Sequence, residues 1–141
     1  MSDECIFCRI VRDELPACRL YEDEHVLAFM DIGPVVKGHA LVIPKRHAED
    51  IREVATEDLR RVMSIVQRIA RAQVEGLDAG GVTVTQANGA VAGQVVPHLH
   101  VHVIPRFEDD GVPRGWPGGR YDSDDEMASC ANRIRTALGP A

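Results

Sequence analysis

The alternation of apolar and polar positions is clearest near the end of the chain. Over residues 98–104, Leu99, Val101 and Val103 alternate with three histidines. A period of two predicts a strand with one buried face. The histidines would share the other face, with nearest neighbours about 6–7 Å apart at roughly 3.3 Å per residue. Pro105 is expected to end the strand, because proline cannot donate to a central ladder.

Similar patterns predict the remaining elements. Further strands are expected at 18–22, 25–30, 40–43 and 81–87. Apolar residues at helical spacing predict a long helix from Thr56, as N-cap, to about Glu75, with Gly76 as its stop. A short helix is expected after Cys5, and the capping box that starts at Ser123 opens a C-terminal helix.

Length and composition limit the class of protein. The chain has 141 residues, of which 45% are hydrophobic and 27% charged, and we expect a single domain over 1–141. A net charge of −6 argues against binding along a nucleic-acid backbone, although a mononucleotide is compatible with it. No apolar run approaches the roughly 20 residues of a membrane span. The N-terminus lacks a secretory pattern, so we expect a cytoplasmic protein that binds neither nucleic acid nor membrane.

Three histidines on one strand face call for a chemical explanation, because neutral imidazoles add little apolar stabilisation and protonated ones repel each other. One interpretation is a three-histidine metal site, since imidazole is a common metal ligand. The other is a phosphate site in which one neutral imidazole attacks and the others donate hydrogen bonds. Strand geometry favours the second interpretation, because it spreads the rings too far for easy convergence on one ion.

The chain has four cysteines, and two of them are close together in the sequence. Cys5 and Cys8 form a Cys-x-x-Cys pair, which is ambiguous between a redox pair and half of a zinc site. Tetrahedral zinc needs two more ligands, for which His47 and His98 are candidates. The other cysteines, Cys18 and Cys130, are expected to pack as small apolar residues. Disulfides are not expected in a reducing compartment.

The run from His98 to Ile104 resembles the defining motif of the histidine triad (HIT) family of nucleotide hydrolases and transferases. The likeness also covers Gly93-Gln94, Pro105-Arg106, Asp31-Ile-Gly-Pro34 and the segment from Gly38 to His47, in the family's order. It implies an α+β fold, with an antiparallel sheet of about five strands, one long helix and a C-terminal helix. It also implies a homodimer in which the sheet continues from one subunit to the other.

The resemblance implies catalytic roles for His98, His100, His102 and His39. His100 would attack the α-phosphorus of a purine nucleoside phosphoramidate, and water would hydrolyse the covalent nucleotidyl-histidine. His102 would stabilise the phosphate oxygens, His98 would orient the site, and His39 would extend the hydrogen-bond network. This mechanism requires no catalytic metal.

The resemblance also implies a site for a purine nucleotide such as AMP. Asp31 would accept hydrogen bonds from the ribose, and Asn88 and Gln94 would help hold the phosphate and leaving group. The base would lie in an apolar slot formed by Ile6, Phe7, Ile10, Phe29 and Ile32. One position departs from the pattern: many relatives carry Ser or Thr after the glutamine, whereas this chain has Val95.

In zinc-containing bacterial relatives, a cysteine pair at this position joins two histidines. Cys5, Cys8, His47 and His98 match that set, so the resemblance implies a structural zinc site. Two other functions stay open, namely a dinucleoside polyphosphate hydrolase and a nucleotide-binding regulatory protein with little turnover. Trp116 is expected to be buried, against a partner subunit near the site.

Overall fold

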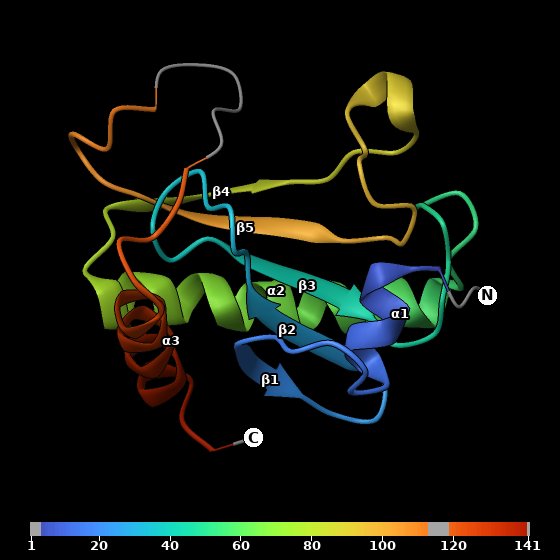
Figure 1. Ribbon diagram of the computed structural model, residues 1–141, viewed down its shortest axis with the longest axis horizontal. Helices are drawn as coiled ribbons and strands as arrows, with labels where there is room; N and C mark the ends of the chain where they lie inside the picture. Colours follow the sequence, from blue (N-terminus) through green and yellow to red (C-terminus); the bar gives the residue numbers. More distant parts are fainter. Residues whose placement is uncertain (1–3, 113–118, 141) are drawn as a thin grey trace.

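The computed structural model describes residues 4–112 and 119–140, so the expectation for Trp116 lies outside the described residues (Figure 1). Five strands form one antiparallel sheet in the order β1-β2-β3-β5-β4. They are β1 (Arg19–Glu22), β2 (Val26–Met30), β3 (Ala40–Pro44), β4 (Gly81–Thr85) and β5 (Val101–Arg106). The helices are α1 (Ile6–Val11), α2 (Thr56–Leu77), the short 3-10 helix η1 (Ala90–Ala92) and α3 (Asp124–Leu138). The α+β fold class is therefore confirmed.

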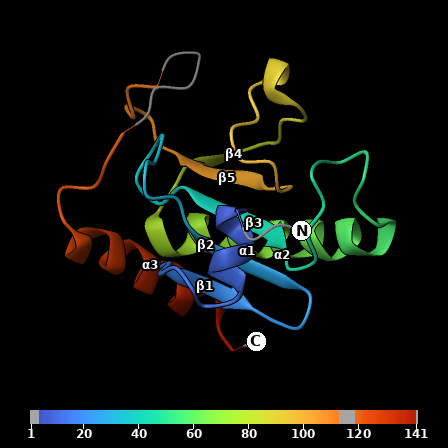
Figure 2. The ribbon, with the colours of Figure 1, turned by 45° about the vertical axis from the view of Figure 1, so that its right-hand side comes forward.

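The two faces of the sheet are covered by different helices (Figure 1, Figure 2). Helices α2 and α3 pack on one face, where Val101 and Val103 of β5 join the larger core. Helix α1 packs on the other, against a smaller cluster that includes Phe29 and Leu41. Because successive strand residues point to opposite faces, the even-numbered histidines lie on the α1 side. No helix within the described ranges is long and apolar enough to span a lipid bilayer.

Strand β5 differs from the prediction at both ends. It starts at Val101, because the segment before it pairs elsewhere: the Leu99 N–H donates to the Ala48 carbonyl at 2.8 Å. It also runs through Pro105, which lies opposite Val82 of β4. The pairing of β5 with β3 ends at Val103, so Pro105 lies beyond that ladder and interrupts none of its bonds.

The ends of α2 also differ from the prediction. Its N-cap is Ala55, without a side-chain cap, and its C-cap is Asp78 in the left-handed conformation. Gly76 lies inside the helix, where α3 packs closely against it. A Cβ atom at Gly76 would lie 2.4 Å from the Arg133 carbonyl oxygen, so the glycine permits helix contact instead of stopping the helix.

Candidate active site

The face of the sheet under α1 carries a cavity of about 710 Å³. His100 and His102 line it, whereas His98 and His39 are fully buried behind its wall. Asp31, at the end of β2, also lines the cavity, and one of its carboxylate oxygens accepts a hydrogen bond from the Gly33 N–H at 2.8 Å. The cavity therefore combines two imidazoles and a carboxylate.

The tautomer of His100 is set by the backbone. Its Nδ1–H donates to the His98 carbonyl at 2.7 Å, so in the neutral ring the lone pair is on Nε2. The Phe7 ring packs edge-on against His100, with 5.2 Å between the ring centroids. Burial lowers the pKa of His100 below its ordinary value of 6.5, so the ring is neutral at pH 7. A neutral imidazole with a free lone pair can act as a nucleophile or base.

His39 and His102 form a chain of hydrogen bonds that also sets their tautomers. The Val35 N–H donates to Nδ1 of His39 at 3.1 Å, so the proton of neutral His39 is on Nε2. That nitrogen lies 2.9 Å from Nδ1 of His102 and donates a hydrogen bond to it. The proton of neutral His102 is then on Nε2. Burial, with His100 and His39 nearby, lowers the pKa of His102 to about 3. His102 is therefore a neutral donor, and its ring packs edge-on against that of His100 with 4.9 Å between the ring centroids.

Cys5, Cys8, His47 and His98 converge beside the cavity, with their ligand atoms all within 4.8 Å of one another. Nδ1 of His47 lies 3.2 Å from Nδ1 of His98 and 3.3 Å from Sγ of Cys8. Sγ of Cys5 lies 3.4 Å from Nδ1 of His98. Tetrahedral zinc, with bonds of about 2.0–2.1 Å to nitrogen and 2.3 Å to sulfur, separates its ligands by about 3.3–3.8 Å. The four side chains fit such an ion.

The protonation of His98 agrees with this fit. Its Nε2–H donates to the Pro44 carbonyl at 2.8 Å, which leaves the Nδ1 lone pair facing the cysteines. Metal-binding histidines commonly donate their second N–H in this way. Burial and the neighbouring Cys5 raise the pKa of the Cys8 thiol, so a cation is needed to hold Cys8 as a thiolate.

Asp31, His39 and His102 form a second cluster of ligand atoms within 4.8 Å of one another. Its hydrogen bonds do not suit a metal. Nδ1 of His39 accepts from a backbone N–H, so a metal on Nε2 would require the imidazolate form of the ring. Asp31 lies 3.5 Å from Nε2 of His39 and is placed to orient that N–H. Hydrogen bonding therefore accounts for this cluster.

A family model for the HIT domain matches residues 12–109. The chain belongs to the HIT domain family. An adenosine 5'-monophosphoramidase of Saccharomyces cerevisiae is 42% identical to it over 121 residues, which cover 85% of this chain and 74% of that protein. An adenylylsulfatase of Arabidopsis thaliana is 38% identical over 110 residues, which cover 78% of this chain and 56% of that protein.

Solved structures share the fold of this HIT domain. A zinc-bound histidine triad family protein from Mycobacterium smegmatis matches it with a TM-score of 0.86 and 38% identity, over 96% of this chain and 93% of that chain.

The five residues expected to form the apolar slot of the HIT chain all line the cavity, and they are Ile6, Phe7, Ile10, Phe29 and Ile32. That they bind a base stays a prediction. Sequence reasoning missed Leu41 and Thr85, which also line the cavity. These two lie opposite His102 on the strands to either side of it, and only the strand register could have identified them.

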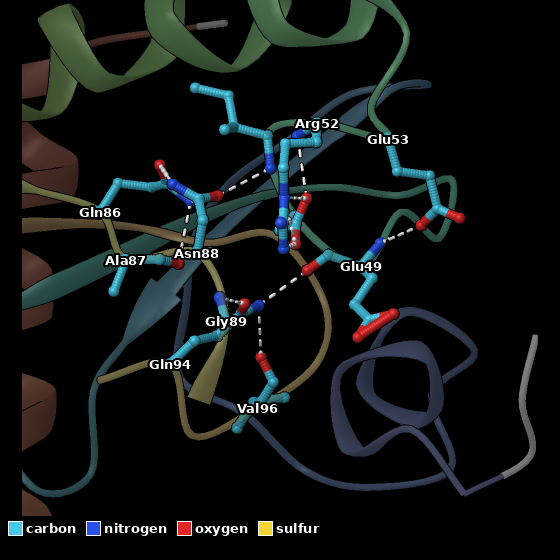
Figure 3. A network of polar contacts seen from close by, with 11 residues as sticks. Glu49, Arg52, Glu53, Gln86, Ala87, Asn88, Gly89, Gln94 and Val96 are labelled. Atoms are coloured by element: carbon cyan, nitrogen blue, oxygen red, sulfur yellow. Dashed lines mark hydrogen bonds and ion pairs between the residues drawn. The ribbon is translucent and has the colours of Figure 1, made fainter. Parts of the chain in front are cut away.

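The side-chain amides of Asn88 and Gln94 hold the glycine-rich loop of the HIT chain (Figure 3). Gln94 donates to the carbonyls of Glu49 at 2.7 Å and Val96 at 3.0 Å, and it accepts from the Gly89 N–H at 2.7 Å. Asn88 accepts from a backbone N–H at 2.7 Å and exchanges hydrogen bonds with the amide of its neighbour Gln86. Neither residue is among the described residues that line the cavity. Their contact with a phosphate stays a prediction, whereas their role in shaping the loop is visible.

Proposed function

We propose that this HIT protein hydrolyses purine nucleoside phosphoramidates through a covalent nucleotidyl-His100. One observation carries the proposal: hydrogen bonds put a lone pair on Nε2 of His100 and a proton on Nε2 of the adjacent His102. A nucleophile and a donor to the phosphate are thus prepared side by side in the cavity. The name of the yeast relative supports the same class of substrate.

The reaction would proceed in two displacements at the α-phosphorus. The Nε2 lone pair of His100 forms a bond to phosphorus, and the bond from phosphorus to the leaving nitrogen breaks as that nitrogen takes a proton from solvent. Water then attacks phosphorus, the bond to His100 breaks, and the nucleoside monophosphate leaves as a proton returns to solvent. His102 and the amides of the loop would stabilise the phosphate oxygens during both steps.

Asp31 and the apolar slot would bind the nucleoside part of the substrate. One carboxylate oxygen of Asp31 accepts from the Gly33 N–H, and the other lies 3.5 Å from Nε2 of His39. The lone pairs that these contacts leave would accept hydrogen bonds from the ribose hydroxyls. Phe7 and Phe29, with 5.4 Å between their ring centroids, form an apolar wall for the base.

We also propose a structural zinc ion held by Cys5, Cys8, His47 and His98. When bound, the ion would supply a fixed charge that keeps both cysteines deprotonated and so stabilises this corner of the fold. With four protein ligands the site is closed, so no reaction step passes through it.

A homodimer is part of the proposal. Strand β4 lies at one edge of the sheet, and Val84 exposes an apolar side chain there. An edge strand with apolar side chains is a place where a second copy can continue the sheet. Analytical ultracentrifugation would test this expectation, and a monomer at micromolar concentration would contradict it.

Val95 favours a second candidate reaction. This residue is 88% exposed and lines the cavity. The rim of the cavity therefore carries methyl groups at the position where a Ser or Thr hydroxyl would donate a hydrogen bond to the leaving group. Substrates whose leaving group departs without a proton, such as dinucleoside polyphosphates, would lose the least rate from the absence of this hydroxyl. They would use the same nucleophile and the same nucleotide site.

Hydrolysis of an adenosine phosphoramidate by the wild type and by His100→Ala tests the proposal. We expect the variant to lose at least about a thousandfold in kcat, which is about 4 kcal/mol of transition-state stabilisation, while it still binds AMP. Similar rates for the two proteins would contradict the covalent mechanism. AMP binding by an inactive wild type would instead favour a regulatory protein, and faster turnover of a dinucleoside polyphosphate would favour the second reaction.

A further inference from the structure

Gln73 of α2 is a fully buried polar residue on the face of the sheet opposite the cavity, with 0% of its surface exposed. Its side-chain Nε2 donates to two backbone carbonyls, those of Gly38 at 3.0 Å and Val103 at 2.9 Å. Gly38 directly precedes His39, and Val103 directly follows His102. One amide group therefore ties together the two chain segments that carry the hydrogen-bonded histidine pair.

The pairing of β3 with β5 explains why this tie is needed. Ala40 lies opposite Val103, so two residues further along Gly38 lies opposite Pro105. Proline has no backbone N–H, so it cannot donate to the Gly38 carbonyl. Gln73 supplies that missing donor, and the Tyr121 hydroxyl accepts the Gly38 N–H at 2.8 Å. Two side chains thus replace the strand pairing next to His39.

The oxygen of the Gln73 side-chain amide, Oε1, is a buried acceptor without a partner among the described residues, which lowers the stability of the fold. The two bonds donated by Nε2 therefore need a reason beyond stability. An unpaired buried acceptor destabilises a fold, and an apolar side chain of similar shape would avoid that loss. The amide is therefore better explained by its two donated bonds than by packing.

We propose that Gln73 is a positioning residue for the His39–His102 pair, acting through the backbone from beneath the sheet. Its bonds hold Gly38 and Val103 so that Nε2 of His39 and Nδ1 of His102 stay 2.9 Å apart. The tautomer of His102 depends on that bond, and with it the donor that faces the phosphate. The kinetic consequence rests on the proposed function, whereas the structural consequence does not.

Gln73→Met is the variant that tests this role, because methionine keeps the length of the side chain and removes both donors. Ile69→Val is the matched control: Ile69 is fully buried one turn earlier on the same helix and bonds to neither strand. We expect Gln73→Met to lower kcat for an adenosine phosphoramidate by at least about tenfold, with KM and AMP affinity within about twofold of wild type. The control should keep its kcat even where it lowers Tm.

Imidazole nitrogen and proton NMR gives a readout that needs no turnover. In the wild type, His39 should show a protonated Nε2 and His102 an unprotonated Nδ1, with the shared proton protected from exchange. Gln73→Met should lose that protected signal, and Ile69→Val should keep it. A preserved signal together with a wild-type kcat in Gln73→Met would overturn the inference.

A double variant separates this inference from the proposed function. If Gln73 acts through His39, then adding Gln73→Met to a His39→Gln protein should lower kcat by less than about twofold. A further tenfold loss would show that Gln73 acts by another route and would overturn the proposal. If the wild type has no activity at all, the proposed function fails, and the NMR signals of the two histidines still decide the role of Gln73.

Discussion

The backbone carbonyl of His98 accepts the Nδ1–H of His100 at 2.7 Å, so the residue that faces the cysteine cluster also sets the tautomer of the residue that faces the cavity. Both ring nitrogens of His98 are engaged as well, with Nε2 on the Pro44 carbonyl and Nδ1 beside Cys5 and Cys8. The Cys/His cluster and the proposed nucleophile are therefore linked through one residue, although the proposed reaction passes no step through the zinc ion.

Loss of the proposed zinc site should consequently weaken both the fold and turnover. Cys8→Ser is expected to abolish bound zinc, to lower Tm by several degrees and to lower kcat by about tenfold, because His98 and then His100 lose their fixed orientation. Metal analysis, thermal unfolding and kinetics measure the three effects. Cys130→Ser on α3 is the control and should keep its zinc. Full kcat in a zinc-free Cys8→Ser protein would show that the two sites are independent.

Asp31→Asn should weaken nucleotide binding through the ribose. Hydrogen bonds to a charged group contribute about 1.5–3 kcal/mol, so the AMP affinity should fall by about tenfold or more. Calorimetry with AMP and 2'-deoxy-AMP tests the assignment. The wild type should prefer AMP, and the variant should bind both nucleotides alike. An Asp31→Asn protein that still discriminates between them would place the ribose elsewhere.

The free energy of unfolding should decrease as the pH falls below about 6.5. The pKa of His102 is lowered to about 3 in the folded protein and that of His39 is lowered too, so the unfolded chain binds more protons in this range. The stabilisation is fully present above the ordinary histidine pKa and is lost as the pH falls towards 3. Each fully buried histidine would contribute at most about 1.4 kcal/mol per pH unit, and the partly exposed His102 less.

Urea unfolding at a series of pH values checks this expectation. His102→Asn keeps an acceptor for His39 and removes one titrating group, so its stability should depend less steeply on pH between 6.5 and 4. His25→Asn removes a half-buried histidine outside the cavity lining and serves as the control. Equal slopes for the wild type and His102→Asn would contradict the assignment.

Short-range patterns predicted which face of β5 each residue takes, because alternation along a strand is a local property. Val101 and Val103 accordingly pack in the core. The start of β5 could not be predicted in the same way, since it depends on the bond from Leu99 to Ala48, far away in sequence. Gly76 was misinterpreted for a similar reason. A glycine is needed there because α3 packs closely against the position, and not because the helix ends there.

The spacing of the histidines and cysteines predicted which side chains gather, but not their protonation. For the Cys/His cluster, the cysteine pair and the resemblance to zinc-containing relatives together predicted the four side chains that the fold brings together. The tautomers of His98, His100 and His39 depend on individual backbone groups, one of them the carbonyl of Pro44. The hydrophobic pattern of the sequence does not predict where individual backbone N–H and C=O groups point. The amides of Asn88 and Gln94 likewise point into the loop, which spacing could not reveal.

Val95→Ser should identify the leaving group that the cavity suits. Because the side chain is 88% exposed, the substitution should change the free energy of unfolding by no more than about 0.5 kcal/mol. A hydroxyl at the rim could donate to a departing nitrogen, and one neutral hydrogen bond contributes about 1 kcal/mol. Turnover of an adenosine phosphoramidate should thus rise by about fivefold, while turnover of adenylyl sulfate, whose leaving group needs no proton, should stay the same.

Val91→Ser provides the control for that comparison, since Val91 of η1 is fully exposed and lies outside the cavity lining. It should change neither rate. An equal gain on both substrates in Val95→Ser would mean that the hydroxyl acts on the shared phosphate and not on the leaving group. In that case Val95 would limit the attack by His100 itself, and the preference for leaving groups would have to originate elsewhere in the cavity.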